Sequence, residues 1–387
     1  MRYLEFPAAE MARRMDNAQV LLGQSDLQGL LITAEANYYY FTGYRPHTSW
    51  STFTRPAYLF ISKEHAPVLL VQVFAFPEAQ SRSAVADVRY FDDVTGSPTS
   101  VVVDTLNELG MAQGVVGCEL GYEQRLGVSY ESFEDLKSQC PGVRFVDAAE
   151  ILWKLRMVKL PSEIAYMREA NQITSRAIEA CFDEAHEGMS EREISRRMME
   201  LMLKMGATAP GFVIICSGPS NYARTSARAT DRSLRRGDML WLDVGVEHHG
   251  YWTDFCRAGV VGGPSAEQQR LQTIVHEATM DACRSIGPGV PVAEVAKECM
   301  AGLEKRGMPA SFECGRLGHG IGLMSTEPPS VILADSTVLE PGMVINVEPG
   351  LVVESGVFVV EEDVLVTEAG YEVMSGASRA LHDIALA

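Results

Sequence analysis

Hydrophobic and polar positions along the first 155 residues follow the periods of helices and strands in turn. The pattern predicts, in chain order, a helix at residues 8–23, strands at 29–33, 56–61 and 68–71, a helix at 98–109, and strands at 114–119 and 144–146. Ser97 is the expected cap of the 98–109 helix, with Pro98 at its first position, where proline is tolerated. We therefore expect residues 1–155 to form one small α/β domain.

A different order of helices and strands begins near residue 156 and occurs twice along the chain. Helices are expected at 162–184 and 190–205, then strands to about residue 261, then helices at 265–286 and up to residue 305, then strands to 366. Ser162 is expected to cap the first of these helices, and Ser190 has Glu193 three residues later, which is a capping box. We expect residues 156–387 to form an α+β domain with an internal duplication.

Carboxylates occupy matching places in the two copies. At an offset of 105 residues, Asp243 aligns with Glu348, and each lies late in an apolar strand two residues before a glycine. Each copy then has a second carboxylate after a turn, Asp254 in the first copy and Glu361 in the second. The repeat therefore predicts that four carboxylates meet in one site.

Four carboxylates in apolar strands need positive charge nearby, because burying one without a partner costs on the order of several kcal/mol. Basic residues are few around these strands, and Arg257 is the nearest. A pair of divalent cations about 3.5–4 Å apart, held by oxygen ligands and a histidine, answers this need most simply. His319 is the histidine candidate, because Gly318 and Gly320 on either side let the backbone come close and expose its imidazole.

Composition and charge narrow the classes of function. The chain has 387 residues, of which 47% are hydrophobic and 22% charged, as in ordinary globular proteins. Its net charge of −18 argues against a nucleic-acid partner or an anionic membrane surface. With no apolar run near the roughly 18 residues of a membrane span and no signal-peptide core, we expect a cytoplasmic protein. The eight cysteines have no CxxC spacing, so they are expected to be reduced and largely buried.

Seven segments carry a specific set of motifs: LRMVKLPSEI (155–164), RRGDMLWLDVG (235–245), GYWTDFCR (250–257), IGPGVPVAEV (286–295), GHGIGL (318–323), PGMVINVEPG (341–350) and EEDVLVTEAG (361–370). Together they resemble the superfamily of Xaa-Pro peptidases, methionine aminopeptidases and creatinase, which has the pita-bread fold. The resemblance implies a creatinase-type α/β domain at residues 1–155 and a pita-bread catalytic domain at 156–387. It also implies a homodimer, in which the N-terminal domain closes the partner's cleft.

The resemblance also implies a metal site. The family's five ligands fall on Asp243, Asp254, His319, Glu348 and Glu361. They imply two divalent ions (Mn, Co, Fe or Zn), with Asp254 and Glu361 bridging, Asp243 on one ion, and His319 and Glu348 on the other. The register also allows Glu362 as the last ligand, and we choose Glu361 by counting back from the strand at 364–367.

By the same resemblance, the catalytic residues are Glu348 and His319. A hydroxide that bridges the metals would attack a carbonyl carbon, and Glu348 would pass the proton to the leaving nitrogen. The expected activity is therefore hydrolysis of a peptide or amide bond in a small molecule or short peptide.

The chain departs from the proline-specific peptidases where those enzymes carry additional substrate-contacting histidines. The loop at 217–226 contains no histidine, position 315 is glycine, and position 326 is threonine. These substitutions keep the expected metal site but remove the usual peptide-binding groups.

A second family branch supplies an alternative function. The segment TEPP (326–329) and the doubled glutamate at 361–362 resemble the dimethylsulfoniopropionate lyases, although an extra acidic ligand of that branch is absent. A metal-dependent lyase acting on such a small carboxylated zwitterion would need a base at a C–H bond, for which Tyr222 and Ser325 are candidates. Creatinase-like C–N hydrolysis and a non-catalytic binding module are further alternatives. We favour the hydrolase, because it needs only the bridging water and Glu348.

Three residues are candidates for substrate binding: Arg55, Arg224 and Tyr222. Arg55, like Tyr44 or His47 near it, could bind a substrate carboxylate next to the partner's site in a creatinase-like dimer. Arg224 stands where the loop histidine is missing, and an arginine suits an anionic substrate. Solvated surface loops are the alternative interpretation for both arginines.

His248 and His249 form an adjacent pair that resembles metal ligands. The pair lies at an expected hairpin turn between Asp243 and Asp254, where side chains usually face solvent. We therefore expect both histidines to be exposed and leave them out of the ligand set.

Overall fold

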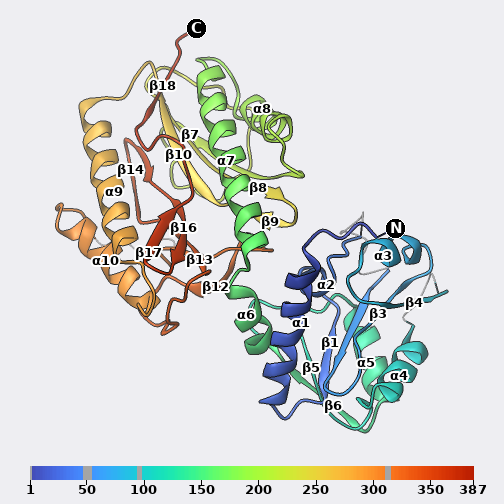
Figure 1. The fold of residues 1–387 in the computed structure, drawn as a ribbon. Helices are drawn as coiled ribbons and strands as arrows, with labels where there is room; N and C mark the ends of the chain where they lie inside the picture. The colour runs from blue at the N-terminus through green and yellow to red at the C-terminus, as the bar shows by residue number, and fades with distance from the viewer. Residues whose placement is uncertain (1, 47–54, 94–97, 310–314) are drawn as a thin grey trace. The chain divides into compact units, whose positions relative to one another are not determined.

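The computed structural model describes residues 2–46, 55–93, 98–309 and 315–387 (Figure 1). The chain divides into two compact units, Met1–Arg156 and Met157–Ala387. Each unit has its own sheets and its own hydrophobic core. Among the described residues, none of the helices is both long and apolar enough to cross a membrane.

The first unit is built on a six-stranded mixed sheet in the order β4-β3-β2-β1-β5-β6, in which β1–β2 and β2–β3 are antiparallel and the other pairs parallel. Apolar side chains of the central strands pack against α4 and α5 to form its core. Its elements are α1 (Ala8–Gly23), β1 (Gly29–Ile32), α2 (Glu35–Thr42), β2 (Tyr58–Ser62), β3 (Val68–Gln72), α3 (Phe76–Arg82), β4 (Asp87–Phe91), α4 (Thr99–Glu108), β5 (Gly114–Cys118), α5 (Tyr130–Gln139), β6 (Val143–Asp147) and α6 (Ala149–Met157).

The expected elements of this unit are all present, with ends shifted by a few residues at most, and the sequence pattern missed others. Helix α2 was missed because its residues from Asn37 to Thr42 are all buried, so it has no polar face and no amphipathic period. Pro98 is the residue before α4 and not its first residue, while Ser97, the expected cap, lies outside the described residues.

The second unit consists of two helix pairs, each followed by a sheet. The strand orders are β18-β10-β8-β7, with β9 paired to β8, and β12-β11-β13-β16-β17, with β14–β15 as a separate hairpin. The elements are α7 (Pro161–Glu184), α8 (Glu191–Lys204), β7 (Ala209–Ser217), β8 (Met239–His248), β9 (Tyr251–Trp252), β10 (Phe255–Val261), α9 (Ala266–Ser285), α10 (Val292–Glu304), β11 (His319–Gly320), β12 (Glu327–Ser330), β13 (Val344–Val347), β14 (Gly350–Val353), β15 (Gly356–Val359), β16 (Glu362–Thr367), β17 (Gly370–Val373) and β18 (His382–Ile384).

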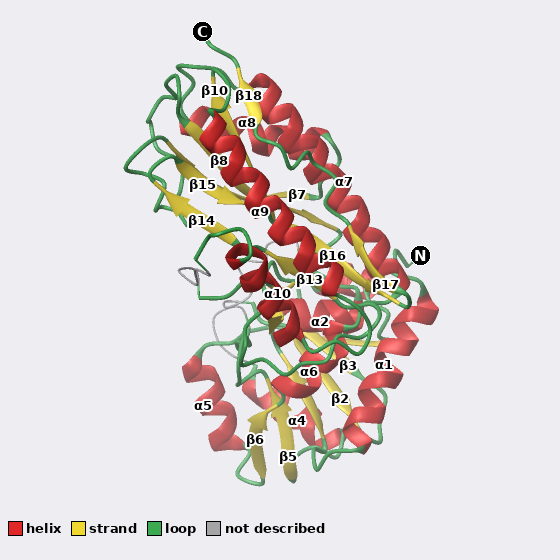
Figure 2. Ribbon diagram, turned by 90° about the vertical axis from the view of Figure 1, so that its left-hand side faces the viewer, coloured by secondary structure: helices red, strands yellow, loops and turns green. Residues whose placement is uncertain are grey.

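Each helix pair covers one face of its sheet (Figure 2). Leu240, Leu242 and Val244 of β8 pack against α7 and α8, together with Met198 and Met202 of α8. Ile345 and Val347 of β13 pack against α9 and α10 in the same way. Because side chains alternate along a strand, the residues between these positions point to the opposite faces of the two sheets.

The helix starts agree with the sequence pattern at α8 and differ at α7. Ser190 and Glu193 form the expected capping box. Helix α7 begins at Pro161 after Leu160 and not at Ser162, because the Glu163 carboxylate accepts the Leu160 N–H at 2.9 Å. The cysteines among the described residues are free and buried, as expected, and Cys314 lies outside these residues.

Candidate metal centre

The first sheet supplies two aspartates. Asp243 lies in β8 between Leu242 and Val244, which pack on α7 and α8, so alternation turns Asp243 to the other face. Asp254 follows β9 and immediately precedes β10, whose Cys256 pairs with Asp243 across the ladder. The hairpin between β8 and β10 therefore brings both aspartates to the same face.

The second sheet supplies two glutamates by the same rule. Glu348 follows β13 directly, and Glu361 precedes β16 directly. Ile345 and Val347 point into the core under α9 and α10, so Glu348 points away from it. Both glutamates are thus placed on the face opposite the helices, as the aspartates are in the first sheet.

His319 comes from the short strand β11, which pairs with β13. Its Nδ1 lies 2.9 Å from the carbonyl oxygen of Gly320 and donates to it, which leaves the Nε2 lone pair for a ligand. Nε2 lies 3.6 Å from Oδ2 of Asp254. Ligand atoms of Asp254, His319 and Glu361 all lie within 4.8 Å of one another. Three of the five expected ligands therefore converge from three separate segments of the chain.

The carboxyl groups are strongly affected by burial and by one another. Burial raises the pKa of Asp254 well above its usual range, and the charges of Glu361 and Asp243 raise it further. Burial, Asp243 and Glu348 likewise raise the pKa of Glu361. The pKa of Glu348 is raised to about 8 and that of Asp243 to about 6, in both cases mainly by burial. A bound divalent cation would relieve this burial of carboxylates close to one another.

The remaining donors also fit a divalent cation. Oδ1 of Asp243 is buried and has no hydrogen-bond partner among the described residues. Burial and, to a smaller extent, the charge of Arg316 lower the pKa of His319 to about 4, so the imidazole is neutral at pH 7. A neutral imidazole and several carboxylate oxygens form the donor set that Mn, Co, Fe and Zn accept.

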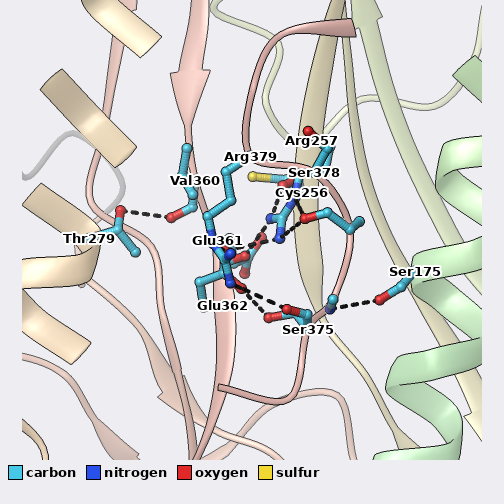
Figure 3. A network of polar contacts seen from close by, with 12 residues as sticks. Ser175, Cys256, Arg257, Thr279, Val360, Glu361, Glu362, Ser375, Ser378 and Arg379 are labelled. Atoms are coloured by element: carbon cyan, nitrogen blue, oxygen red, sulfur yellow. Dashed lines mark hydrogen bonds and ion pairs between the residues drawn. The ribbon is translucent and has the colours of Figure 1, made fainter. Parts of the chain in front are cut away.

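The two adjacent glutamates, Glu361 and Glu362, have different partners, as Figure 3 shows. Nη2 of Arg257 donates to Oε1 of Glu362 at 2.9 Å, and both side chains are fully buried. Arg379 donates to both oxygens of the same carboxylate, and the Ser375 hydroxyl donates to Oε2. Glu362 is therefore neutralised by the protein itself, which favours Glu361 as the ligand and supports our choice between the two.

Two polar residues of the site were missed by the sequence analysis, Asn346 and Asp363. Nδ2 of Asn346 donates to the carbonyl of Asp254 and to Oε1 of Glu361, both at 2.7 Å. Oδ2 of Asp363 accepts the backbone N–H of Asp254 at 3.2 Å. The signal was present, because Asn346 stands two residues before Glu348 and Asp363 two after Glu361, on the same strand faces.

Of the expected substrate-binding residues, Tyr222 and Arg224 lie on the segment after β7 and Arg55 lies in the first unit. Tyr222 is buried, and its hydroxyl accepts the backbone N–H of Met239 at 3.0 Å, at the start of β8. Arg224 is exposed on the loop after β7, and Arg55 is exposed in the first unit. Tyr44 is buried, while His47 lies outside the described residues.

The expected exposure of the histidine pair is wrong, because His248 is buried and His249 is half-buried. His248 is 6% exposed, and its Nε2 lies 3.3 Å from Oε2 of Glu169 on α7. His249 has a φ of 50° in the tight turn to β9 and stacks on Tyr166 at 4.4 Å between ring centroids. The short turn between β8 and β9 lies against α7, and this contact buries His248.

Comparison with known proteins decides the family. Residues 165–368 match the model described as metallopeptidase family M24, and residues 14–158 match the creatinase/prolidase N-terminal domain. The chain belongs to metallopeptidase family M24. The expected pita-bread fold with a creatinase-type N-terminal domain is confirmed.

Relatives of this M24 protein cover most of its length. A Xaa-Pro dipeptidase of Pyrococcus furiosus is 27% identical over 373 residues, which is 96% of this chain and 100% of that protein. An uncharacterised peptidase of Staphylococcus aureus strain MW2 is 30% identical over 345 residues, 89% of this chain and 93% of that one. The structure of a Xaa-Pro dipeptidase from Bacillus anthracis matches with a TM-score of 0.84 at 26% identity, over 97% of this chain and 100% of that chain. The M24 protein described here is therefore a metallohydrolase whose family uses divalent metal ions.

Proposed function

We propose that this M24 protein is a dinuclear metal-dependent hydrolase that cleaves the peptide or amide bond of a short substrate, with Xaa-Pro peptides as the first class to test. The observation that carries the proposal is the convergence of Asp254, His319 and Glu361 within 4.8 Å, next to the partnerless Oδ1 of Asp243. The names of the relatives, Xaa-Pro dipeptidases, point to the same bond.

The proposed ligands divide between two ions. Asp254 and Glu361 would hold both, Asp243 one of them, and His319 and Glu348 the other. Bound divalent ions would make a water molecule acidic enough to attack a carbonyl carbon at neutral pH. Asn346 fixes the Glu361 carboxylate by its 2.7 Å hydrogen bond, so the ligand is oriented before substrate arrives.

Glu348 is the proposed proton carrier. As a ligand it would lie beside the attacking water, which is where a carboxylate can accept that proton. It would take the proton of the attacking water and release it to the nitrogen that leaves. His319, which stays neutral, contributes an imidazole ligand and no proton.

A lyase remains the second candidate, and one observation weighs against it. Abstraction of a proton from carbon needs a base beside the substrate, and Tyr222 was one of two candidates in the sequence. Its hydroxyl is already hydrogen-bonded to Met239 inside the core. Cytoplasmic location and a homodimer remain predictions.

The test starts with the metal content of the purified protein and of Asp254→Ala and His319→Ala. Exposed Asp231→Ala and His186→Ala serve as matched controls. We expect about two ions per chain, lost in the first two variants and kept in the controls, and hydrolysis of Gly-Pro or Ala-Pro-Xaa peptides with Mn²⁺.

Two results would contradict the proposal in different ways. If the purified wild-type protein contains no metal, the proposal of a dinuclear site is wrong. If the protein binds two ions but cleaves neither peptides nor amides, the proposed hydrolase activity is wrong. Dimethylsulfoniopropionate would then be the substrate to assay.

A further inference from the structure

Asp363 is a buried carboxylate beside the proposed metal centre that is not among the proposed ligands. It lies on β16, where it pairs with Asn346 of β13 across the ladder, and its side chain is 0% exposed. Its Oδ2 accepts the backbone N–H of Asp254 at 3.2 Å. Because it follows Glu361 by two residues, the two side chains belong to the same strand face. Asp363 therefore contacts one proposed bridging ligand and neighbours the other.

One turn of α7 supports the same part of the centre. Oγ1 of Thr174 lies 2.8 Å from Oγ1 of Thr253, the residue immediately before Asp254. The amide of Asn171, one turn earlier on α7, is buried and favours the charged form of Asp363. Asp254 is thus held in two ways, through its own N–H by Asp363 and through its neighbour by α7.

The charge of Asp363 is not balanced by a basic side chain. Within the part of the chain that the structure describes, no arginine, lysine or histidine pairs with Asp363, whereas Arg257 and Arg379 both bind the adjacent Glu362. Burial raises the pKa of Asp363 to about 7, against the opposing effect of the Asp254 N–H and of nearby asparagine amides. A neutral side chain of the same shape would fill this position at a lower cost. A carboxylate here therefore points to a function for the charge itself.

The charge of Asp363 acts on both proposed bridging ligands. It raises the pKa of Asp254 and that of Glu361, because like charges repel one another. The same electric field attracts a cation held between these two carboxylates. Since all three side chains are buried, solvent and salt screen this attraction only weakly.

We propose that Asp363 is a positioning residue of the metal centre, which fixes the backbone of Asp254 and whose negative charge increases the affinity for divalent ions. The inference rests on the dinuclear site of the proposed function. Asp363 holds no ion itself and acts through Asp254 and Glu361. It differs in this respect from Glu362, whose charge Arg257 and Arg379 already neutralise.

The test measures Mn²⁺ affinity, by competition with a metal indicator, in the wild type, Asp363→Asn and Asp363→Leu. The asparagine keeps an acceptor for the Asp254 N–H and removes the charge, whereas the leucine removes both. We expect the affinity to fall about 10- to 100-fold in Asp363→Asn and further in Asp363→Leu. Glu368→Gln is the matched control, because it removes an exposed carboxylate from the turn between β16 and β17, and it should leave the affinity unchanged.

Urea unfolding of the metal-free proteins separates this role from a merely structural one. Loss of a structural aspartate would lower stability and metal affinity together. We expect metal-free Asp363→Asn to be at least as stable as the wild type, because the variant no longer buries an unbalanced charge. At saturating Mn²⁺, its electron paramagnetic resonance spectrum should still show two coupled ions, since the Asp254 N–H keeps an acceptor.

The contrary results are equally specific. Equal Mn²⁺ affinity of the wild type and Asp363→Asn would overturn the inference. An equal loss in Glu368→Gln would also overturn it, because the position of the charge would then not matter. If metal-free Asp363→Asn loses stability together with affinity, Asp363 has only a structural role and the inference is wrong. A wild type that binds no Mn²⁺ would instead reject the proposed site and this inference together.

Discussion

The side-chain amide of Asn346 donates a hydrogen bond of 2.7 Å to the carboxylate of Glu361, and the same nitrogen reaches the carbonyl of Asp254 at 2.7 Å. One nitrogen thereby fixes a residue from each copy of the internal repeat. The relative position of two proposed ligands depends on this contact.

Replacing Asn346 by leucine should therefore weaken metal binding. Loss of a group that orients ligands typically lowers metal affinity about 10- to 100-fold, and we expect this range for Mn²⁺ by competition with a metal indicator. Asn107→Ala, which removes an exposed amide on α4, is the control and should leave the affinity unchanged. An unaltered affinity in the Asn346 variant would mean that the ligands orient themselves.

Substitutions of the adjacent residues Glu361 and Glu362 should have different effects on metal binding and on stability. Glu361→Gln should abolish metal binding and leave the metal-free protein as stable or more stable, because it removes a buried charge without a cationic partner. Glu362→Gln should lower the free energy of unfolding by about 3–5 kcal/mol, because buried Arg257 loses its counter-charge. Metal content and urea unfolding of both variants measure the difference, and the reverse pattern would assign Glu362 as the ligand.

The stability of the metal-free protein should fall as pH rises from about 4.5 to about 8. The pKa of Glu348 is raised by burial from 4.5 to about 8, so in this interval the folded state holds protons that the unfolded state has lost. Stability then decreases with pH, and the loss is complete above the folded-state pKa. The rise in Tm on adding Mn²⁺ should be larger at pH 8 than at pH 5, by roughly 5 °C or more. Metal-free protein that gains stability over this interval would contradict the assignment.

Tyr222→Phe distinguishes a structural tyrosine from a substrate-binding one. The substitution leaves the buried N–H of Met239 without its acceptor, which should cost about 1–3 kcal/mol of stability. KM and kcat should stay within twofold of the wild type when assayed well below the Tm. A selective increase in KM without a change in stability would return Tyr222 to the substrate-binding residues.

Much of the fold and of the candidate site could be predicted from the sequence, because strand alternation and the internal repeat act over short distances. The two patterns alone are enough to place Asp243 and Glu348 on equivalent strand faces. The role of Asn346 could not be predicted, since it depends on a partner from another segment, Asp254.

The errors have equally local causes. Residues 35–42 gave no helical signal because α2 is buried on every side. His248 was expected to be exposed because side chains in hairpin turns usually face solvent. This turn instead packs against α7. Ser162 does not cap α7 as expected, because the helix already begins at Pro161 and Glu163 in its first turn accepts the N–H of Leu160.

The buried guanidinium of Arg257 sets a limit on when the second unit can close during protein synthesis. Besides Glu362, it donates to the carbonyls of Cys256, Glu361 and Ala377. Residues 382–384 then add β18 alongside β10, the strand that carries this arginine. A nascent chain that still lacks residues 375–384 would lack the Ala377 carbonyl that Nε of Arg257 needs, so we expect the second unit to close fully only after these last segments have left the ribosome.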